Sequence, residues 1–519
     1  MIERDGLHTL GRWTRDRAIA TPHRVAVDDR GVVLTYIDLD CRSTNLAESL
    51  LQAGYGVGDR IATVTGNSAD HVVLFFACAK AGFILVPLSW RLTPRELAQQ
   101  LETADPALLL IEEEFSSLAG EALNRLLSPM AVGSLGAHGI ERKIVSPIRT
   151  TTEEVIRRPV RDDDALLLIF TSGTLEQAKA AILTHANCFW TNLSLSRTAE
   201  ITRGDTVLAV MPQYHVGGWN IQPLLAWWMG ATVVLERTFD PGRVLKLIAD
   251  RGITTMMGVP ANYLILAEHP AFATTDLSSL SHAIVGGAPM PEPLLRVWHE
   301  RGVALTQGYG LTEASPNVLC LPDEEARSHI GSAGKPYPHV EVAVTDPITG
   351  EILQGVCTGE LMVRGPGVFA GYFRAPDATK AVLRNGWLAT GDLVSRDEDG
   401  NYRIIDRIKD IFITGGESVA PAEIEGILFG HPAVADVSVV GVPDDRWGEV
   451  GVAWVVLRSG VATDETDLLT FCSSLLARFK VPKQIIFVAE IPRSASNKAM
   501  RRALLAEWKT ASENREDAK

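Results

Sequence analysis

Short apolar runs of strand length alternate with longer amphipathic segments along most of the chain. Residues 60–65 predict a buried strand, Ser68 can cap a helix that reaches about Ala81, and residues 83–87 predict the next strand. The same alternation returns further along, at residues 205–211, 231–235, 253–257 and 282–285. This order predicts an α/β architecture with largely parallel sheets.

The pattern changes near residue 330. Residues 330–405 are rich in Gly and Pro and contain short alternating runs, such as 341–345 and 360–364. Such alternation is typical of antiparallel strands with one solvated face. We therefore predict a small antiparallel sheet or barrel in this part of the chain.

A second change follows near residue 406, where a charged, extended segment precedes a separate β and α pattern. The predicted elements are a helix from Pro421, strands around 436–441, 451–457 and 484–488, and a helix around 464–477. They predict a small α+β domain. The predicted boundaries are an N-terminal domain at 1–406, with a small β subdomain at 320–406, a connecting segment at 407–410 and a C-terminal domain at 411–519. That the connecting segment is a hinge and the C-terminal domain mobile is implied by the family resemblance named below.

Composition narrows the class of protein. The 519 residues are too many for one compact core, and 46% hydrophobic with 22% charged residues is ordinary for a soluble protein. A net charge of −14 disfavours nucleic acid or an anionic membrane as partner. The six cysteines show no C-x-x-C spacing, no signal peptide is evident, and the apolar run 224–235 is too short to span a bilayer. We expect a cytoplasmic protein without stable membrane insertion.

A candidate phosphate loop follows one predicted strand. The apolar run 165–170 leads into Thr171, Ser172, Gly173 and Thr174. Small hydroxyl residues around a glycine let hydroxyl and backbone N–H groups converge on phosphate oxygens. Thr171, Ser172 and Thr174 are therefore candidate phosphate ligands.

A second candidate motif is the segment 307–313, which reads QGYGLTE and resembles the adenylate motif of the adenylate-forming superfamily, a resemblance that implies the following roles. Gly310 would let the backbone approach a nucleotide, and Tyr309 offers a ring for stacking on adenine. Thr312 can hydrogen-bond a phosphate, and Glu313 can hold Mg²⁺ beside it. The structural alternative is a plain turn between two elements.

These motifs, with TGD at 390–392 and MPQYHVGG at 211–218, resemble the adenylate-forming (ANL) superfamily of acyl-CoA synthetases, peptide-synthetase adenylation domains and luciferases. The resemblance covers nearly the whole chain, from residues 34–36 to Lys498. It implies a large N-terminal domain and a small domain that rotates about a hinge. It also implies an acyl-CoA ligase that binds CoA and the AMP moiety of an acyl-adenylate.

The resemblance assigns further nucleotide and acyl contacts. Asp392 would accept hydrogen bonds from the ribose, Arg407 would contact ribose and phosphate, and Gly287 and Ala288 would flank the adenine. His215 would lie beside the reacting carbonyl. A structural histidine or a solvated arginine is the alternative in each case.

The resemblance also assigns the mobile domain. Lys409 would be the hinge and Lys498 the adenylation lysine. Gly415 and Gly416 would line the tunnel for the pantetheine thiol, where a side chain would block it, and Trp447 would stack on the CoA adenine. A basic group suited to the CoA phosphates, or simply a solvated charged face, consists of Arg478, Lys480 and Lys483.

The phosphate loop departs from the family pattern Thr-Ser-Gly-Thr-Thr-Gly-x-Pro-Lys-Gly. Leu175, Glu176, Ala178 and Ala180 stand at four of its positions, and Lys179 is kept. Glu176 adds a Cβ where the family has glycine and a negative charge beside the pyrophosphate. At about 4 Å and an effective dielectric of about 20, one such repulsion costs roughly 4 kcal/mol.

This departure favours a non-adenylating acyl-CoA ligase, which transfers the acyl group of a preformed acyl-adenylate to CoA. A separate adenylating ligase would supply the adenylate, and neither ATP nor Mg²⁺ at Glu313 would be needed. Such split ligases are found in platensimycin-type diterpenoid antibiotic biosynthesis. Two alternatives stay open: a complete ATP-dependent synthetase, and an inactive homologue that acts as a binding partner.

The acyl pocket is assigned by family position only. Its expected lining is mostly apolar and favours a hydrophobic aryl, fatty or terpenoid acid. The expected residues are Trp190, Val216, Gly217, Trp219 and the segments 284–288 and 308–314.

Overall fold

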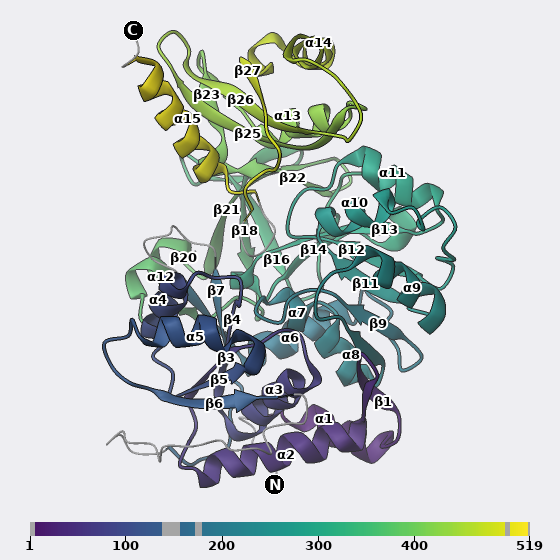
Figure 1. Cartoon of the computed structure of the whole chain (residues 1–519), viewed down its shortest axis with the longest axis vertical. Helices are drawn as coiled ribbons and strands as arrows, with labels where there is room; N and C mark the ends of the chain where they lie inside the picture. Colours follow the sequence, from purple (N-terminus) through teal and green to yellow (C-terminus); the bar gives the residue numbers. More distant parts are fainter. Residues whose placement is uncertain (1–5, 137–155, 172–178, 494–498, 517–519) are drawn as a thin grey trace.

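The computed structural model describes residues 6–136, 156–171, 179–493 and 499–516. These residues form a large N-terminal part and a small C-terminal domain that lies at one end of it (Figure 1). Two of the predicted site segments, around Glu176 and Lys498, fall outside the described residues.

A seven-stranded sheet carries the first part of the α/β pattern. Its strand order is β19-β8-β7-β4-β3-β5-β6, with a parallel centre and two antiparallel strands at one edge. The strands are β3 (Arg60–Val64), β4 (Ile84–Leu88), β5 (Leu108–Glu112), β6 (Ala131–Leu135), β7 (Ala165–Thr171), β8 (Lys179–Thr184) and β19 (Gly371–Tyr372).

A nine-stranded sheet carries the second part, in the order β15-β14-β13-β12-β11-β9-β10-β1-β2. Its interior pairs are parallel, as predicted, and antiparallel strands close both edges. The strands are β1 (Val25–Asp29), β2 (Val32–Thr35), β9 (Thr206–Ala209), β10 (Thr232–Leu235), β11 (Thr255–Gly258), β12 (His282–Val285), β13 (Leu305–Gly310), β14 (Asn317–Cys320) and β15 (Lys335–Pro336).

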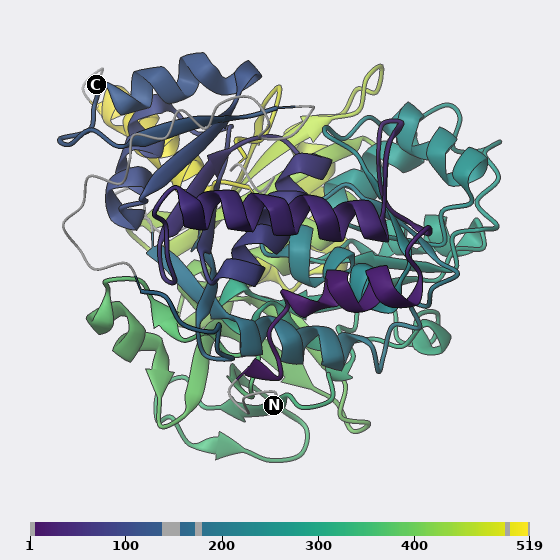
Figure 2. The ribbon, with the colours of Figure 1, turned by 90° about the horizontal axis from the view of Figure 1, so that it is seen from below.

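Helix α3 (Ala69–Ala81) is the most buried helix between these sheets. It packs against α2 (Tyr36–Gln52) and touches β4 of one sheet and β1 of the other. Ser68 caps it, as predicted. Helices α1 (Arg12–Ala20) and α2 lie across the end of the molecule far from the small domain, as the purple helices of Figure 2 show.

The remaining helices of the large part cover the two sheets, and most begin after a strand ends. They are α4 (Pro94–Ala104), α5 (Ser116–Leu123), α6 (His185–Leu195), α7 (Gly217–Asn220), α8 (Pro223–Met229), α9 (Pro241–Arg251), α10 (Pro260–Glu268), α11 (Glu292–Glu300) and α12 (Pro376–Val382).

The Gly- and Pro-rich region forms the predicted small antiparallel sheet. Its order is β17-β16-β18-β21-β20, with β22 added beside β21. The strands are β16 (Glu341–Thr345), β17 (Ile352–Leu353), β18 (Cys357–Arg364), β20 (Leu383–Arg384), β21 (Trp387–Arg396) and β22 (Tyr402–Arg407). Strand β22 leads directly into the small domain (Figure 1).

The small domain has the predicted α+β composition. A long hairpin of two strands is joined by β23 and β24 on one side and by a parallel β27. The elements are β23 (Phe412–Thr414), β24 (Glu417–Val419), β25 (Val434–Asp444), β26 (Gly448–Leu457), β27 (Gln484–Phe487), α13 (Pro421–Phe429), α14 (Glu465–Leu475) and α15 (Arg501–Glu516). The predicted fold class is confirmed, while the exact domain boundaries stay predictions.

Within the described ranges, no helix has both the length and the apolar character that a bilayer crossing requires. The Leu224–Leu235 run is split between α8 and β10, both largely buried, as expected for core. The cytoplasmic location stays a prediction.

Two buried histidines make stability depend on pH. Burial lowers the pKa of both His71 and His185 to about 4. His71 lies between the Thr63 hydroxyl and the Gln213 Oε1, each 3.1 Å away. Because these pKa values lie below those of the unfolded chain, the stabilising effect is present above about pH 6.5 and is lost toward about pH 4.

We therefore expect urea unfolding to show a lower stability at about pH 5.5 than at about pH 7.5, by about 1 kcal/mol for each histidine. A His71→Gln variant removes one of these titrations, so it should lose less stability between the two pH values. An equal loss in the variant and the wild type would contradict this assignment.

Candidate active site

Three of the predicted nucleotide residues meet at one carboxylate. Asp392 on β21 is 4% exposed. Its Oδ1 lies 2.6 Å from Arg407 Nε, and its Oδ2 accepts a hydrogen bond of 2.5 Å from the Tyr309 hydroxyl. Burial and the charge of Asp392 hold the pKa of Tyr309 well above its usual value, so the phenol stays a donor.

Sheet register explains this meeting. Asp392 and Arg407 are direct partners across the β21–β22 pair, so their side chains emerge side by side. The Thr390 hydroxyl donates to the Leu361 carbonyl and accepts from the Asp392 N–H, which fixes the irregular stretch of β21 that contains the TGD segment. Burial opposes the charge of Arg407, but the nearby acidic groups, Asp392 foremost, together outweigh it, so the pKa of the guanidinium is raised.

Glu313 lies in the neighbouring turn Thr312–Ala314 and is held by a residue that sequence reasoning missed. The Tyr372 hydroxyl donates to Glu313 Oε1 over 2.7 Å. Burial, followed by the charge of Glu313, raises the pKa of Tyr372. The charge of Glu313 also helps to raise the pKa of Arg407, which ties this pair to the Asp392 group.

The strand ends that flank the phosphate loop lie close to the same tyrosine, Tyr372. Thr171 and Lys179 are cross-strand partners at the end of the β7–β8 pair. Tyr372 on β19 pairs with Ala181 on β8, and Lys179 Nζ lies 5.3 Å from the centre of the Tyr372 ring. Ser172, Thr174 and the substituted positions 175–178 lie outside the described residues.

The other predicted nucleotide positions follow strand ends. Gly287 and Ala288 form an exposed loop after β12, and Thr312 is half-buried in its turn. Packing alone explains why position 310 is a glycine: a Cβ there would lie 1.6 Å from the Pro316 carbonyl oxygen. The backbone therefore needs glycine at this position with or without a nucleotide.

The segment around His215 is a tight turn before α7. The Gly218 N–H donates to the His215 carbonyl, and a Cβ at Gly218 would lie 2.3 Å from the Pro212 oxygen. His215 itself is half-buried. The structure describes no ligand, so its predicted role at the acyl carbonyl stays a prediction.

Two aromatic residues expected in the acyl pocket differ in burial. Trp219 is fully buried, stacks on Phe75 at 4.7 Å and donates its indole N–H to the Gln213 carbonyl. It is part of the hydrophobic core, and its place in the acyl pocket stays a prediction. Trp190 is half-buried and packs edge-on against His339.

The predicted CoA-side residues lie on the small domain. Lys409 is exposed in the turn Ile408–Asp410. Gly415 and Gly416 are exposed, and a Cβ at Gly415 would lie 3.0 Å from the Trp447 ring. Trp447 is 47% exposed.

The basic group is largely ion-paired in this structure. Lys480 lies 2.7 Å from a Glu423 carboxylate oxygen, and Lys483 pairs with Asp444. Arg478 is exposed. Such ion pairs are typical of an ordinary charged surface. A CoA phosphate would therefore have to compete with carboxylates for Lys480 and Lys483.

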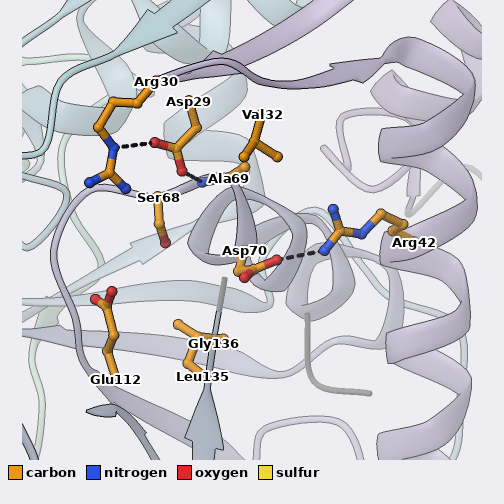
Figure 3. A pocket seen from close by; sticks show the side chains of 10 residues that line it. All are labelled: Asp29, Arg30, Val32, Arg42, Ser68, Ala69, Asp70, Glu112, Leu135 and Gly136. Carbon is orange, nitrogen blue, oxygen red and sulfur yellow. Dashed lines mark hydrogen bonds and ion pairs between the residues drawn. The ribbon is translucent and has the colours of Figure 1, made fainter. Parts of the chain in front are cut away.

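A polar cavity of about 200 Å³ lies away from these residues, near the start of α3 (Figure 3). Its charged groups pair with each other: Arg42 lies 2.5 Å from Asp70, and Arg30 lies 2.8 Å from Asp29. Asp29 also accepts from the Ala69 N–H. The cavity includes none of the predicted site residues.

The donor set near Glu313 fits Mg²⁺ held together with substrate phosphates. Mg²⁺ is commonly bound by one or two carboxylates plus phosphate oxygens rather than by an all-protein cage. In the part of the chain that the structure describes, no three His, Cys, Asp or Glu side chains form such a cage. Glu313, oriented by Tyr372, would supply the single carboxylate.

A two-part fold with a buried Asp392–Arg407 pair and a nearby Glu313 is the arrangement predicted for an adenylate-forming enzyme. Comparison with known proteins agrees. The family model "AMP-binding enzyme" matches residues 14–373, and the model "AMP-binding enzyme C-terminal domain" matches residues 423–498. The chain belongs to this family of acyl-CoA synthetases and ligases, whose members use ATP, Mg²⁺ and CoA and form AMP intermediates.

Individual relatives cover almost the whole chain. A feruloyl-CoA synthase from an Amycolatopsis species is 38% identical over 493 residues, which span 95% of this chain and 97% of that protein. ATP-bound MatB from Rhodopseudomonas palustris has a TM-score of 0.87 at 31% identity, covering 97% of this chain and 99% of that one. The o-succinylbenzoate CoA synthetase MenE from Bacillus subtilis, in complex with the acyl-adenylate intermediate OSB-AMP, has a TM-score of 0.83 at 31% identity, covering 95% and 97%.

Tyr372 provides a test of the Glu313 geometry. Tyr372→Phe keeps the ring beside Lys179 but removes the hydroxyl that orients Glu313. A hydrogen bond to a charged group contributes about 1.5–3 kcal/mol, so we expect the apparent Mg²⁺ affinity in the ATP-dependent step to fall at least about tenfold. Thioester formation from a preformed adenylate should change little.

The matched control is Tyr36→Phe, which removes a buried hydroxyl that donates to the Ala231 carbonyl over 2.6 Å, far from Glu313. This variant should lose stability without any change in Mg²⁺ dependence. Equal effects of the two substitutions on Mg²⁺ dependence would show that Tyr372 has only a packing role.

Proposed function

We propose that this protein is a complete, ATP-dependent acyl-CoA synthetase that acts on a hydrophobic, aromatic carboxylic acid. One observation carries the proposal: Glu313 is anchored by Tyr372 beside the Asp392–Arg407 pair. A ligase that used only preformed adenylates would not need an oriented magnesium carboxylate. This supports ATP use in spite of the unusual phosphate loop.

The reaction has two balanced steps. In the first, the substrate carboxylate attacks the α-phosphorus of ATP, and pyrophosphate leaves with the electron pair of the broken P–O bond. In the second, the CoA thiol loses its proton and attacks the acyl carbonyl, and AMP leaves. Mg²⁺ bound with ATP would neutralise phosphate charge in the first step only.

The chain's own residues have separate tasks in these steps. Asp392 would accept from the ribose hydroxyls, with its remaining charge matched by Arg407. Arg407, 44% exposed at its side chain, could also reach the α-phosphate that both steps share. His215 would hydrogen-bond the acyl oxygen, and Lys498 would serve the first step alone.

The relatives favour an aromatic acid. The Amycolatopsis relative is a feruloyl-CoA synthase, and MenE acts on o-succinylbenzoate, so both names specify an aryl-containing acid. The half-buried residues around His215 and the strand ends of β12 and β13 leave mostly small or apolar groups for such an acyl chain. A hydroxycinnamic-type acid is therefore the first substrate class to test.

Glu176 favours a second candidate function, the transfer of acyl groups from a preformed adenylate without adenylation. Its charge opposes a triphosphate but is tolerable for an adenylate, which carries a single phosphate charge. Under this candidate, a separate ligase would supply the adenylate, as in the platensimycin-type pathways.

The deciding experiment compares two complete reactions. The protein receives CoA with either MgATP and a panel of hydroxycinnamic and benzoic acids, or the matching synthetic acyl-adenylates. We expect thioester from both mixtures, and pyrophosphate release in the first. Thioester from the adenylates alone would refute ATP dependence and support the second candidate, and thioester from neither would leave only a binding role.

The Glu176 charge can be separated from its Cβ by a pair of variants. Glu176→Gln removes the charge and keeps the Cβ, whereas Glu176→Gly removes both. If charge repulsion weakens ATP binding, both variants should lower the KM for ATP by at least about tenfold. If the loop needs glycine geometry, only Glu176→Gly should do so. Lys498→Ala should abolish pyrophosphate release and spare transfer from the adenylate.

A further inference from the structure

One buried carboxylate connects the small domain to the strand that leads into it. Asp406, near the end of β22, is buried with its side chain 5% exposed. Its Oδ2 accepts from the Ala422 N–H on α13 over 2.8 Å, and its Oδ1 accepts from Arg501 Nη1 on α15 over 3.1 Å. Both donors follow the predicted hinge at residues 407–410, and Asp406 precedes it. These contacts therefore cross the hinge.

The Arg501 guanidinium has two further carboxylate partners. Its Nη1 lies 3.2 Å from Asp410 Oδ2, and its Nη2 lies 2.8 Å and 3.0 Å from the two oxygens of Glu425. Asp410 and Glu425 lie in the predicted hinge and on α13. One cation thus faces three carboxylates, of which only Asp406 is on the large-domain side.

A rotation of the small domain about Lys409 would keep some of these contacts and break others. Arg501, Ala422 and Glu425 all follow the pivot and would move together, so the Arg501–Glu425 pair would persist. Asp406 would stay with β22, and its bonds to Arg501 and Ala422 would break. The Asp406 bonds therefore stabilise only the orientation that the structure shows.

Exposure indicates which orientation this is. The predicted CoA-side residues Gly415, Gly416 and Trp447 face solvent here. The small domain contacts the large one elsewhere, through an ion pair between Arg458 and Glu268 on α10. Thioester formation would require the solvent-facing loop to turn toward the acyl-adenylate, so the observed orientation differs from the one that this step would need.

We propose that Asp406 and Arg501 form a latch that holds the small domain in its adenylation orientation. Both are positioning residues, because they act through the placement of the domain. Arg501 follows the predicted adenylation lysine, Lys498, by three positions in the sequence. The assignment to the adenylation step rests on the proposed function; the latch itself does not.

Two isosteric variants separate the latch from general packing. Asp406→Asn weakens the bonds that cross the hinge, and Arg501→Gln removes the guanidinium. Glu425→Gln is the matched control, because it weakens a bond of the same guanidinium within the small domain. Urea unfolding of each variant checks that the fold is intact.

The first readout needs no activity. Arg407 and Lys409 in the hinge are natural trypsin sites, and cleavage there under native conditions follows the population of the open form. Loss of a charge-assisted hydrogen bond should increase hinge cleavage roughly tenfold in Asp406→Asn and Arg501→Gln, and much less in Glu425→Gln. Equal cleavage of Asp406→Asn and Glu425→Gln, measured by mass spectrometry of the fragments, overturns the latch.

The second readout is the ratio of the two half-reactions. Both latch variants should lower ATP–pyrophosphate exchange relative to thioester formation from a preformed adenylate by roughly tenfold, whereas Glu425→Gln should keep the wild-type ratio. An unchanged ratio in the latch variants refutes the assignment to adenylation. Absence of pyrophosphate exchange in the wild type refutes the proposed function instead, and the trypsin comparison still decides on the latch.

Discussion

The buried charge of Asp392 is the constraint on which the site depends. A carboxylate that is almost fully removed from water is costly unless its oxygens are paired, and Arg407 and Tyr309 provide the partners. Arg407 is also the last residue of β22 and the first residue of the predicted hinge at 407–410. The interaction that satisfies the buried charge therefore also fixes the point from which the small domain departs. The predicted nucleotide contacts and the position of the small domain thus depend on one ion pair.

A second connection runs from the phosphate loop to the magnesium carboxylate. The short strand β19 adds to the edge of the seven-stranded sheet beside β8, and its Tyr372 reaches Glu313 in the turn between β13 and β14 of the nine-stranded sheet. The N–H of Phe369 donates to the Glu313 carbonyl, which strengthens the same junction. The groups that would contact the two ends of a polyphosphate are thus connected through one hydrogen-bonded segment. A displacement of the phosphate loop would therefore also displace Glu313.

The strands, and the site residues that belong to short sequence motifs, could be predicted from the sequence. Features that depend on tertiary contacts could not. Buried parallel strands such as β3 and β12 appear as apolar runs, and the predicted and observed bounds nearly coincide. The β25–β26 hairpin is longer than predicted, because its polar ends pair in the ladder without an apolar signal. Tyr372 was missed because a two-residue strand in a Gly-rich region has no periodicity. Core and pocket have the same apolar composition, so the sequence alone does not separate the two roles for a buried residue such as Trp219. The roles of His215, Lys409 and Trp447 depend on ligands and stay predictions.

The two half-reactions differ in the charge that the phosphate loop must accept, and not in the adenosine contacts. Under the proposed function, an acyl-adenylate and ATP would present the same ribose to Asp392 and the same α-phosphate to Arg407. Only ATP would bring β- and γ-phosphates to the predicted phosphate loop, whose sequence contains the negative charge of Glu176 and the positive charge of Lys179, which lies beside the Tyr372 ring. A carboxylate in this loop would then weaken the first half-reaction selectively, while the buried pair at Asp392 would continue to serve the second. A single position can in this way shift an enzyme of this fold between making its own adenylate and accepting one from solution.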